Sequence, residues 1–593
     1  MPSPALIDLS KLFTEGSFKK KLFKIVQKPL ETALKVSNCN DVYDQIQAKT
    51  GKPGSPDGAN FFDTALAELG VQYNIKSGST SSIPATGPVF VVANHPFGGV
   101  DGLILGSILL SQRSDSKILA NFLLGKLPEI VPYLIPVNPF GGKAAMRENL
   151  KGLREAGQWL ADENCLATFP AGIVSHVQKG TKSIQDSTWH ANIARLARKH
   201  GATIVPLHFS GGNSKPFYRS GLIHPRLRTG MLVRELFNKS SQEIEVRMGT
   251  PIPPSQFKDH QSDKDLARYF QMRCEILKHQ EMETPATEAP ATEPVVFEEI
   301  AERNPVEKLI EDIENLPESA LILEKGKFKV YAAEAPEIPH ILEEIGRTRE
   351  LTFRAVGEGV GRPLDLDKYD QHYRHIFLWH SEANEIVGAY RIAMVDVVLA
   401  SHGIEGLYTS NVFDYSDDAF DSLDDGKTVE LGRSYIVPSY QRRGTSLFLL
   451  WRAIIQHVKK NGYTKLFGAV SISDDYHPLS KGLIMRYLRH NKFQTGFANK
   501  MRARKKPHYE KMRSLKSFDY PEALPSLENV SGLVSELEAD KKGVPTLIKH
   551  YLQLNGVILG FGVDASFSDA LDGFILVDLE KVNPTVLKKY EGK

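Results

Sequence analysis

A low-complexity segment near the middle of the chain sets the strongest limit on its fold. Residues 282–294 read METPATEAPATEP, an acidic and proline-punctuated composition that favours an extended linker without a core of its own. The chain has 593 residues, which is too long for a single hydrophobic core. We therefore predict a linker over residues 281–297, between a domain of residues 85–280 and a domain of residues 298–593 with a C-terminal extension. We expect residues 1–84 to form a helical region ahead of both, with contact to the membrane interface as one interpretation.

Alternating helix and strand patterns predict the fold class. In the first domain a polar helical pattern at residues 147–163 precedes an apolar strand pattern at residues 166–169. The same order recurs at residues 191–200 and 203–209. Such alternation is typical of layered α/β domains. The second domain has strand patterns at residues 386–392 and 428–437 before a helical pattern at residues 447–460, so we expect an α/β fold there too.

The composition of the chain indicates its cellular compartment and limits the classes of its binding partners. The 73 basic and 71 acidic side chains nearly cancel, so no footprint of a nucleic-acid-binding protein is visible. The three cysteines lack the spacing of a disulfide framework or a metal site, which favours a reducing compartment and predicts no bound metal. The start of the chain lacks a secretory signal pattern, and no uninterrupted apolar run approaches the ~20 residues of a membrane span. We expect a cytoplasmic protein that is soluble or peripheral on the inner face of the membrane.

One segment near the N-terminus suggests contact with lipid. Residues 18–28, FKKKLFKIVQK, combine a lysine cluster with apolar side chains. On a helix, many of the apolar groups share one side, which is the pattern of an interfacial helix on anionic lipid. An ordinary amphipathic surface helix has the same pattern, and the sequence does not separate the two.

A histidine and an aspartate in the first domain carry candidate chemistry. His95 follows the apolar strand pattern of residues 88–93, and Asp101 precedes a helical pattern. An imidazole with a carboxylate one turn away is a general base with its orienting partner. Gly98 and Gly99 between them allow a tight turn. Alternatively, Asp101 only caps the helix and His95 is a loop histidine.

Further motifs give this domain a resemblance to the glycerolipid acyltransferases, whose boxes read His-x4-Asp, Phe-Pro-Glu-Gly-Thr-Arg-Ser and Val-Pro. Residues 95–101, 169–175 and 204–207 match these boxes in order, with five residues instead of four between His95 and Asp101. The resemblance implies O-acyl transfer, with Gly172 and Ser175 shaping a substrate loop whose backbone N–H groups are available to an oxyanion. Ala171 and Val174 replace the glutamate and arginine of the second box. Since a guanidinium matches phosphate, loss of this arginine argues against a phosphate-bearing acceptor.

The second domain contains a candidate acyl-donor turn. A strand pattern leads into residues 438–446, PSYQRRGTS, and then into a helix. Backbone N–H groups, the positive helix end and arginines make such a turn an anion cradle. The pattern Gln-x-x-Gly-x-Ser resembles the signature of the GNAT acyltransferases. It implies donor binding by Gln441, Arg442, Arg443, Gly444 and Ser446.

A narrower resemblance in this domain is to the acyl-homoserine lactone synthases, which use acyl carrier protein thioesters. Their ordered pattern is matched by Arg349, Phe353, Asp367, Asp370, Arg391, Glu430 and Arg433. The resemblance implies an amino-acid acceptor whose α-amine is acylated. Glu430 is then the candidate base, and Arg391 or Arg433 the candidate cation for a carboxylate. A structural Glu–Arg ion pair is the alternative for Arg433.

Together the halves resemble the bifunctional ornithine-lipid synthases of bacteria. This resemblance implies that the second domain transfers a 3-hydroxyacyl group from acyl carrier protein, or CoA, to the α-amine of ornithine. The first domain then acylates the resulting hydroxyl, on an acceptor without phosphate. Glycine, lysine or glutamine, a lysophospholipid acceptor, and a non-catalytic membrane scaffold are the alternatives. Residues 543–579 resemble the C-terminal part of hemolysin-like acyltransferase proteins, and we assign them no chemistry.

Overall fold

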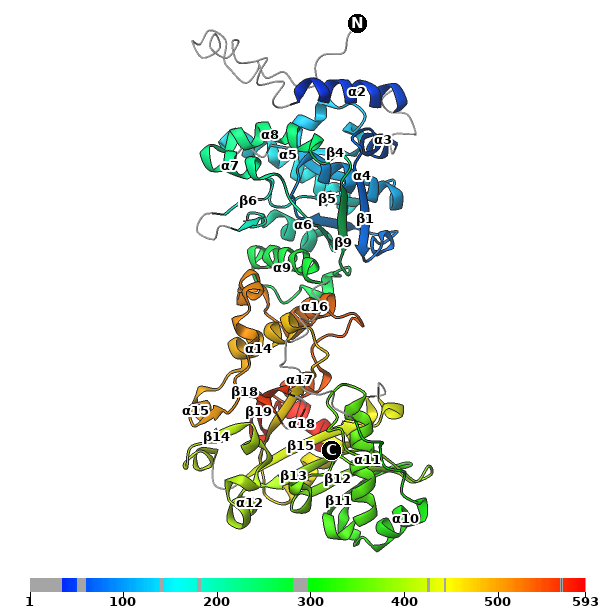
Figure 1. Ribbon diagram of the computed structural model, residues 1–593, viewed down its shortest axis with the longest axis vertical. Coiled ribbons are helices and arrows are strands. Elements are labelled where there is room, and N and C mark those ends of the chain that lie inside the picture. The colour runs from blue at the N-terminus through cyan, green and yellow to red at the C-terminus, as the bar shows by residue number, and fades with distance from the viewer. Residues whose placement is uncertain are drawn as a thin grey trace. The chain divides into compact units, whose positions relative to one another are not determined.

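The computed structural model describes residues 35–50, 60–138, 142–178, 183–280, 297–423, 427–441, 444–565, 567 and 569–591. These residues belong to two compact units (Figure 1). Unit 1 takes in Met1–Glu281 with Tyr520–Ala539, and unit 2 takes in Met282–Asp519 with Asp540–Lys593. The predicted interfacial helix at residues 18–28 and residues 281–296 of the predicted linker lie outside the described residues.

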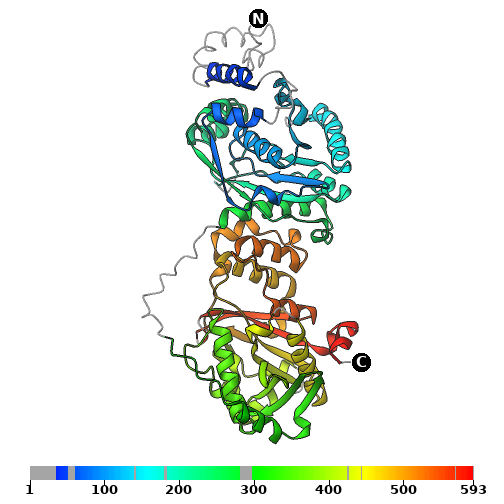
Figure 2. The ribbon, with the colours of Figure 1, turned by 90° about the vertical axis from the view of Figure 1, so that its right-hand side faces the viewer.

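Unit 1 is built on a seven-stranded, mostly parallel sheet with helices on both faces (Figure 2). The strand order is β1-β9-β8-β2-β5-β3-β4, in which β8 and β9 are antiparallel. The strands are β1 (Gln72–Ser77), β2 (Val89–Ala93), β3 (Ser116–Asn121), β4 (Leu134–Val137), β5 (Cys165–Thr168), β8 (Thr203–Phe209) and β9 (Glu243–Met248), and a separate hairpin joins β6 (His176–Val177) to β7 (Ile184–Gln185). All five residues of β2 are buried, as expected for a central parallel strand covered on both faces.

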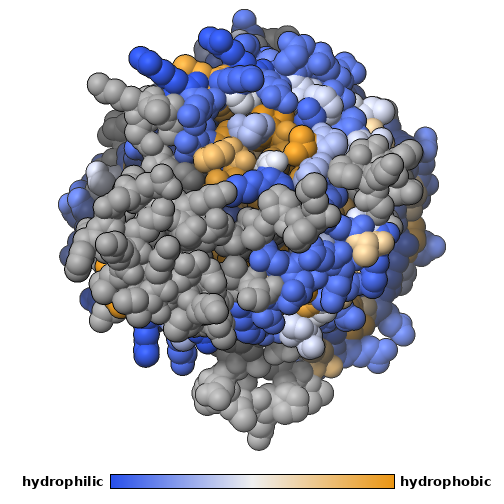
Figure 3. Space-filling view, turned by 90° about the horizontal axis from the view of Figure 1, so that it is seen from above, coloured by the Kyte–Doolittle hydropathy of each residue, from blue (hydrophilic) through white to orange (hydrophobic). Residues whose placement is uncertain are grey.

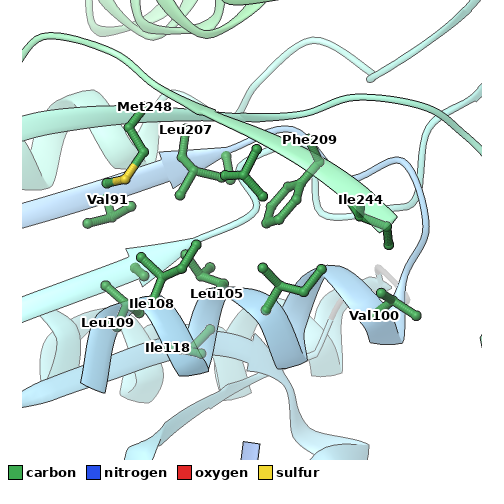
Figure 4. Packing of buried hydrophobic residues seen from close by; sticks show 14 of the residues in the cluster. Val91, Val100, Leu105, Ile108, Leu109, Ile118, Leu207, Phe209, Ile244 and Met248 are labelled. Atoms are coloured by element: carbon green, nitrogen blue, oxygen red, sulfur yellow. The ribbon is translucent and has the colours of Figure 1, made fainter. Parts of the chain in front are cut away.

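The helices of unit 1 pack on this sheet or on one another. They are α2 (Val36–Thr50), α3 (Asn60–Glu68), α4 (Gly99–Gln112), α5 (Gly142–Ala161), α6 (Asn192–His200), α7 (Lys215–Ile223), α8 (Pro225–Phe237) and α9 (Asp263–Glu275). Figure 4 shows Leu105 and Ile108 of α4 facing Leu207 and Phe209 of β8. Burial of this helix therefore fixes its first turn against the carboxyl end of β2, where the candidate site lies.

A segment from the far end of the chain completes unit 1. Helix α16 (Leu527–Leu537) packs on α9, where Glu536 pairs with Arg273 at 2.5 Å and accepts a hydrogen bond from the Thr250 backbone at 2.9 Å. The predicted bounds assign these residues to the second domain, whereas the structure places Tyr520–Ala539 in unit 1. Their partners lie more than 250 residues earlier in the chain, which no local pattern reveals.

Unit 2 contains an eight-stranded mixed sheet in the order β10-β11-β12-β13-β15-β16-β19-β18. Its strands are β10 (Leu321–Lys325), β11 (Phe328–Glu334), β12 (Arg374–His380), β13 (Glu385–Met394), β15 (Thr428–Ile436), β16 (Lys465–Ile472), β18 (Val557–Asp564) and β19 (Ala570–Asp578), and a separate pair joins β14 (Phe413–Tyr415) to β17 (Met501–Ala503). Its helices are α10 (Val306–Asn315), α11 (Pro339–Arg354), α12 (Val395–His402), α13 (Thr445–Lys460), α14 (Pro478–Lys492), α15 (Thr495–Ala498), α17 (Thr546–Gln553) and α18 (Pro584–Glu591). The predicted α/β class is thus confirmed for both domains.

The centre of this sheet opens between two parallel strands. Strands β15 and β16 pair only over residues 428–430 and 465–467. Beyond that point β15 continues beside β13, whereas β16 continues beside β19. The strands therefore separate toward their carboxyl ends, and the turn into α13 begins at the end of β15.

Two surface observations bear on lipid contact. In the described part of the chain, no helix is both long enough and apolar enough to cross a bilayer. Figure 3 shows apolar side chains gathered on one face of unit 1 within an otherwise hydrophilic surface.

Candidate active sites

In unit 1 the structure brings His95 and Asp101 together. His95 lies two residues after the end of the buried strand β2, and its Nδ1 is 2.9 Å from Oδ2 of Asp101. The Asp101 side chain is fully buried, while the His95 side chain is 17% exposed. With Nδ1 engaged by the carboxylate, Nε2 is the ring nitrogen that can take a proton from a substrate. The five-residue spacing, unusual for the resembled family, thus still closes the dyad.

Asp101 also caps helix α4. Its Oδ2 accepts hydrogen bonds from the backbone of Phe97 at 2.9 Å and of Gly98 at 3.0 Å. Gly98 has a φ of 100°, a conformation that side-chain-bearing residues rarely adopt. One oxygen of Asp101 therefore caps the helix and also holds the imidazole, and the catalytic role of the pair stays a prediction.

The loop after β5 covers one face of the imidazole. The ring of Phe169 stacks on His95 with centroids 4.2 Å apart and an interplanar angle of 20°. The backbone N–H of Gly172 donates to Phe169, and that of Ser175 donates to the His95 carbonyl at 2.8 Å. These two amides are already used within the protein, so Gly172 and Ser175 fix the loop against the histidine.

A buried carboxylate that the sequence did not reveal ties this loop down. Asp186 accepts hydrogen bonds from the hydroxyl of Ser175, from the indole of Trp189 at 3.1 Å and from the His95 backbone at 3.3 Å. Burial raises the pKa of Asp186, and the hydrogen bonds from Ser175 and Trp189 offset part of this effect. Asp186 lies 91 residues after His95, and no motif connects the two.

The second box of unit 1 is apolar where the resembled family carries charge. Ala171 and Val174 are both buried, at 3% and 8% exposure. Val174 packs in a cluster with Phe217 and Tyr218. The position of the missing arginine is therefore filled by hydrocarbon.

In unit 2 the predicted charged residues form one buried network. Arg349 binds both oxygens of Asp370, at 3.1 and 2.9 Å, and Arg391 binds both oxygens of Asp367, at 2.6 and 2.9 Å. Asp365, which the sequence patterns did not single out, accepts from Nε of Arg349 at 3.1 Å. Burial alone would raise the pKa of Asp370, but Arg349 and Arg391 hold it well below its usual value.

Arg433 is the most loosely paired arginine of this network. It lies on β15 in a left-handed conformation with a φ of 49°, 3.6 Å from both Asp365 and Asp367. Its guanidinium lies over the rings of Tyr408 and Phe567, and among the described residues its Nε has no hydrogen-bond partner. Arg433 is thus an ion-pair member, but its partners are aspartates and not the glutamate of the structural alternative, and its Nε remains for a further anion.

Glu430 is surrounded by donors. Its Oε2 accepts from the hydroxyl of Tyr373 and from the backbone of Tyr408, and its Oε1 accepts from the backbone of Thr409 at 2.8 Å. The side chain is 1% exposed. Glu430 therefore holds the segment at residues 408–409, and its action as a base stays a prediction.

A cavity of about 300 Å³ opens beside Arg433. Its lining includes Asp367, Lys368, Tyr369, Tyr408, Asn411 and Arg433. Cations and a carboxylate thus face one space, which matches the charge pattern of an amino acid.

The remaining predicted residues lie around this centre. Phe353 is nearly buried, its ring edge-on to Phe567 with centroids 5.1 Å apart. Gly444 has a φ of 64° and begins α13, Ser446 is buried in the first turn, and Gln441 donates to the Ile436 carbonyl at 2.8 Å. Arg442 and Arg443 lie outside the described residues. No group of acidic, cysteine and histidine side chains in the described residues is arranged to hold a metal ion.

Comparison with protein families assigns both halves. Residues 55–281 match the family described as acyltransferase, and residues 348–452 match the acetyltransferase (GNAT) domain. These matches contain the His95–Asp101 dyad and most of the charged network, respectively.

Relatives of known function extend this assignment. The glycine N(alpha)-acyltransferase of Phocaeicola vulgatus is 30% identical over 274 residues, covering 44% of this chain and 82% of the relative. The lyso-glycine lipid O-acyltransferase of the same organism is 30% identical over 203 residues, covering 33% of this chain and 70% of the relative. The L-ornithine N(alpha)-acyltransferase of Brucella abortus is 24% identical over 275 residues, covering 45% of this chain and 87% of the relative.

The family domains and these relatives agree on the class of reaction and on the presence of two different acyltransferases. The chain is therefore an acyltransferase that belongs to the family of the bacterial aminolipid N(alpha)-acyltransferases and lyso-aminolipid O-acyltransferases, with both kinds of domain in one polypeptide.

Proposed function

We propose that the protein makes a diacylated aminolipid in two steps. Unit 2 transfers a 3-hydroxyacyl group from an acyl carrier protein or CoA thioester to the α-amine of an amino acid. Unit 1 then transfers a second acyl group to the 3-hydroxyl of that product. The observation that carries this proposal is the dyad of His95 and Asp101 in a site without the phosphate-binding arginine, on the same chain as an amino-acid-sized charged cavity.

The second step follows from the geometry of the dyad. His95 Nε2 accepts the proton of the acceptor hydroxyl, whose oxygen attacks the thioester carbonyl carbon. The new C–O bond forms, the C–S bond breaks, and the imidazolium returns the proton to the leaving thiolate. Asp101 stabilises the imidazolium while it carries that proton, because its carboxylate is 2.9 Å from Nδ1.

The acceptor of this step lacks a phosphate in our proposal. Val174 occupies the arginine position with an aliphatic side chain packed on Phe217. An apolar wall there suits the acyl chain of a lyso-aminolipid, whereas a phosphate would be left without its guanidinium partner.

Ornithine is the acceptor amino acid that we predict for the first step. Arg433 and Lys368 in the cavity suit the α-carboxylate, and Asp367 suits an ammonium group. Glycine is the second candidate, because the N-acyltransferase with 30% identity is named for glycine and the one with 24% identity for ornithine.

Peripheral binding to anionic lipid is part of the proposal. At the tip between α7 and α8, Leu222, Ile223 and Leu227 are 69%, 78% and 52% exposed. No acidic residue occurs between Lys215 and Arg234, while arginines flank the apolar tip. Apolar side chains ringed by cations are the pattern of an interfacial contact.

The lipid contact is tested with phosphatidylglycerol-containing vesicles. Glutamates at both Leu222 and Ile223 should lower the vesicle-bound fraction about tenfold, because they remove apolar contact and add negative charge. The matched control, Val397→Glu, replaces an apolar residue of unit 2 that is 58% exposed, and should bind as the unaltered protein does. Equal binding by all three would refute a contact at this tip.

The lipid products test the function as a whole. The chain is expressed in a host without aminolipids, and extracted lipids are analysed by mass spectrometry with labelled ornithine or glycine supplied. A diacylated ornithine lipid is the expected product, and a diacylated glycine lipid would transfer the proposal to the second candidate. A mono-acylated product alone would contradict the role of unit 1, and a host with well-expressed protein and no new lipid would contradict the proposal.

A further inference from the structure

A second carboxylate of unit 2 lies where the central sheet opens. Glu358 follows helix α11, and its electrostatic neighbours are Ser471 on β16 and Arg433 on β15. These two strands no longer pair beyond residues 430 and 467. Glu358 is therefore located at the gap between the strand that leads to the candidate donor turn and the strand that joins the C-terminal hairpin.

The loop that carries Glu358 is firmly held. Its backbone N–H donates to the Phe353 carbonyl at 2.9 Å. Two residues further on, Val360 and Gly361 donate to the carboxylate of Glu350, at 2.9 and 3.0 Å. Gly357 provides the turn with a φ of 77°. A side chain on such a loop is positioned before any substrate binds.

The carboxylate of Glu358 is buried and incompletely bonded. The residue is 5% exposed, and among the described residues its Oε1 has no hydrogen-bond partner. A buried polar atom of this kind is costly unless a ligand or a proton uses it. Oε1 is thus available to a substrate ammonium.

The surroundings of Glu358 adjust its protonation. The pKa of Glu358 is raised to about 7, chiefly by burial, with Asp475 adding to the rise and Ser471, Arg433 and Lys481 opposing it. The buried carboxyl of Asp572, whose own pKa is raised by burial and by Asp564 and Glu358, faces the same space. A group with a pKa near the working pH is populated in both its protonated and its deprotonated form, so it can accept and release a proton.

The cavity reaches the same neighbourhood. Val360, two residues from Glu358, and Arg433 both line it. Tyr408 lines it as well and donates from its hydroxyl to Asp564 at 2.5 Å. Glu358 is not itself among the residues that line the cavity, but an amino acid whose carboxylate pairs with Arg433 would lie next to an arginine that interacts electrostatically with Glu358.

We propose that Glu358 is the catalytic base of the N-acyl transfer, accepting a proton from the α-ammonium of the amino acid. This inference rests on the proposed function of unit 2. The freed amine attacks the thioester carbonyl, a C–N bond forms and the C–S bond breaks. Of the two protons that the nitrogen loses, one protonates the leaving thiolate and one passes through Glu358 to solvent.

This assignment gives Glu430 a different task. Both of its oxygens are already bonded, and two of its three donors are backbone amides at residues 408 and 409. It holds Tyr408, which lines the cavity, and is therefore a positioning residue in this proposal. Its predicted action as the base becomes the rival that the experiment must separate.

The test measures N-acylation by the full chain with an acyl carrier protein thioester and the amino acid found in the lipid product. Glu358→Gln should lower kcat by about 10²–10⁴-fold, with KM for the amino acid within threefold. In the unaltered protein, kcat should fall as the pH drops below about pH 7, which is the acidic limb of its pH profile. In Glu358→Gln this limb should disappear. Glu358→Asp should keep the limb at a lower rate, and added formate should restore part of the activity of Glu358→Ala. Glu324→Gln, on exposed strand β10, is the matched control.

Two readouts separate failure of folding from failure of the idea. Thermal unfolding of each variant and its O-acylation of supplied lyso-lipid report the folded chain. A folded Glu358→Gln with near-normal kcat and an unchanged acidic limb would overturn the inference. If only Glu430→Gln loses the acidic limb, the inference is also overturned and Glu430 is the base. If the unaltered protein acylates no amino acid, the proposed function itself fails, and this inference with it.

Discussion

The two candidate sites balance buried charge in different ways. In unit 1 a single fully buried carboxylate, Asp101, is held by two backbone N–H groups at the start of α4 and by one imidazole. In unit 2 three carboxylates and three guanidiniums neutralise one another in one network. The first site depends on helix geometry, and the second depends on an equal number of opposite charges.

This difference predicts where each site is fragile. Backbone donors remain when a side chain is removed. Substitutions at the site of unit 1 should therefore leave its fold stable and lower its catalytic activity. A guanidinium removed from a buried network leaves carboxylates without partners, so unit 2 should lose stability first. Activity and unfolding, measured on the same variants, decide between these patterns.

Removing the imidazole gives the largest expected effect. His95→Ala should lower O-acylation by at least about 10³-fold, because the hydroxyl loses its proton acceptor. The unfolding of unit 1 should change little, since Asp101 keeps its backbone partners. N-acylation in the same preparation is the internal control, so lyso-lipid should accumulate. Diacylated product formed at the normal rate would show that another group is the base.

Removing one arginine of the network should mainly affect stability. Arg391→Ala leaves Asp367 and Asp370 buried beside fewer cations, at an expected cost of about 3–5 kcal/mol to the unfolding of unit 2. The matched control is Arg489→Ala, whose half-exposed pair with Glu510 should contribute at most about 1 kcal/mol. Denaturant unfolding measures the stability losses of both variants, and O-acylation is followed separately. If the two variants show equal and small losses in the free energy of unfolding, the charged network is well hydrated.

How much of these sites the sequence predicts depends on the span of chain that forms them. His95 and Asp101 are six residues apart, on a strand end and the next helix, so a local pattern finds them. The residues of unit 2 are predicted by two resemblances, to the GNAT signature and to the ordered pattern of the acyl-homoserine lactone synthases, and all except Arg442 and Arg443 lie in the described part of the chain. The sequence patterns do not predict that these residues meet, because only the folded sheet brings them together.

The residues that the sequence did not reveal are joined over long distances or lack a motif. Asp186 reaches the His95 loop across 91 residues, and Glu536 reaches Thr250 across 286. Asp365 and Glu358 lie in a glycine-containing loop after α11, where no pattern distinguishes them from solvated charges. Only packing shows that both are buried.

Asp101 has both roles at once, and two substitutions separate them. In Asp101→Asn the amide oxygen can still accept from Phe97, Gly98 and the imidazole, so the cap and the tautomer of His95 persist while the negative charge is lost. A hydrogen bond to a charged group is worth about 1 kcal/mol more than a neutral one, which predicts a roughly fivefold lower kcat for O-acylation. Asp101→Ala also removes the cap, at a further cost of about 1 kcal/mol to the unfolding of unit 1. If Asp101→Asn destabilises unit 1 as much as Asp101→Ala does, the buried charge itself holds α4, and the contrast between the two sites is smaller than their geometry indicates.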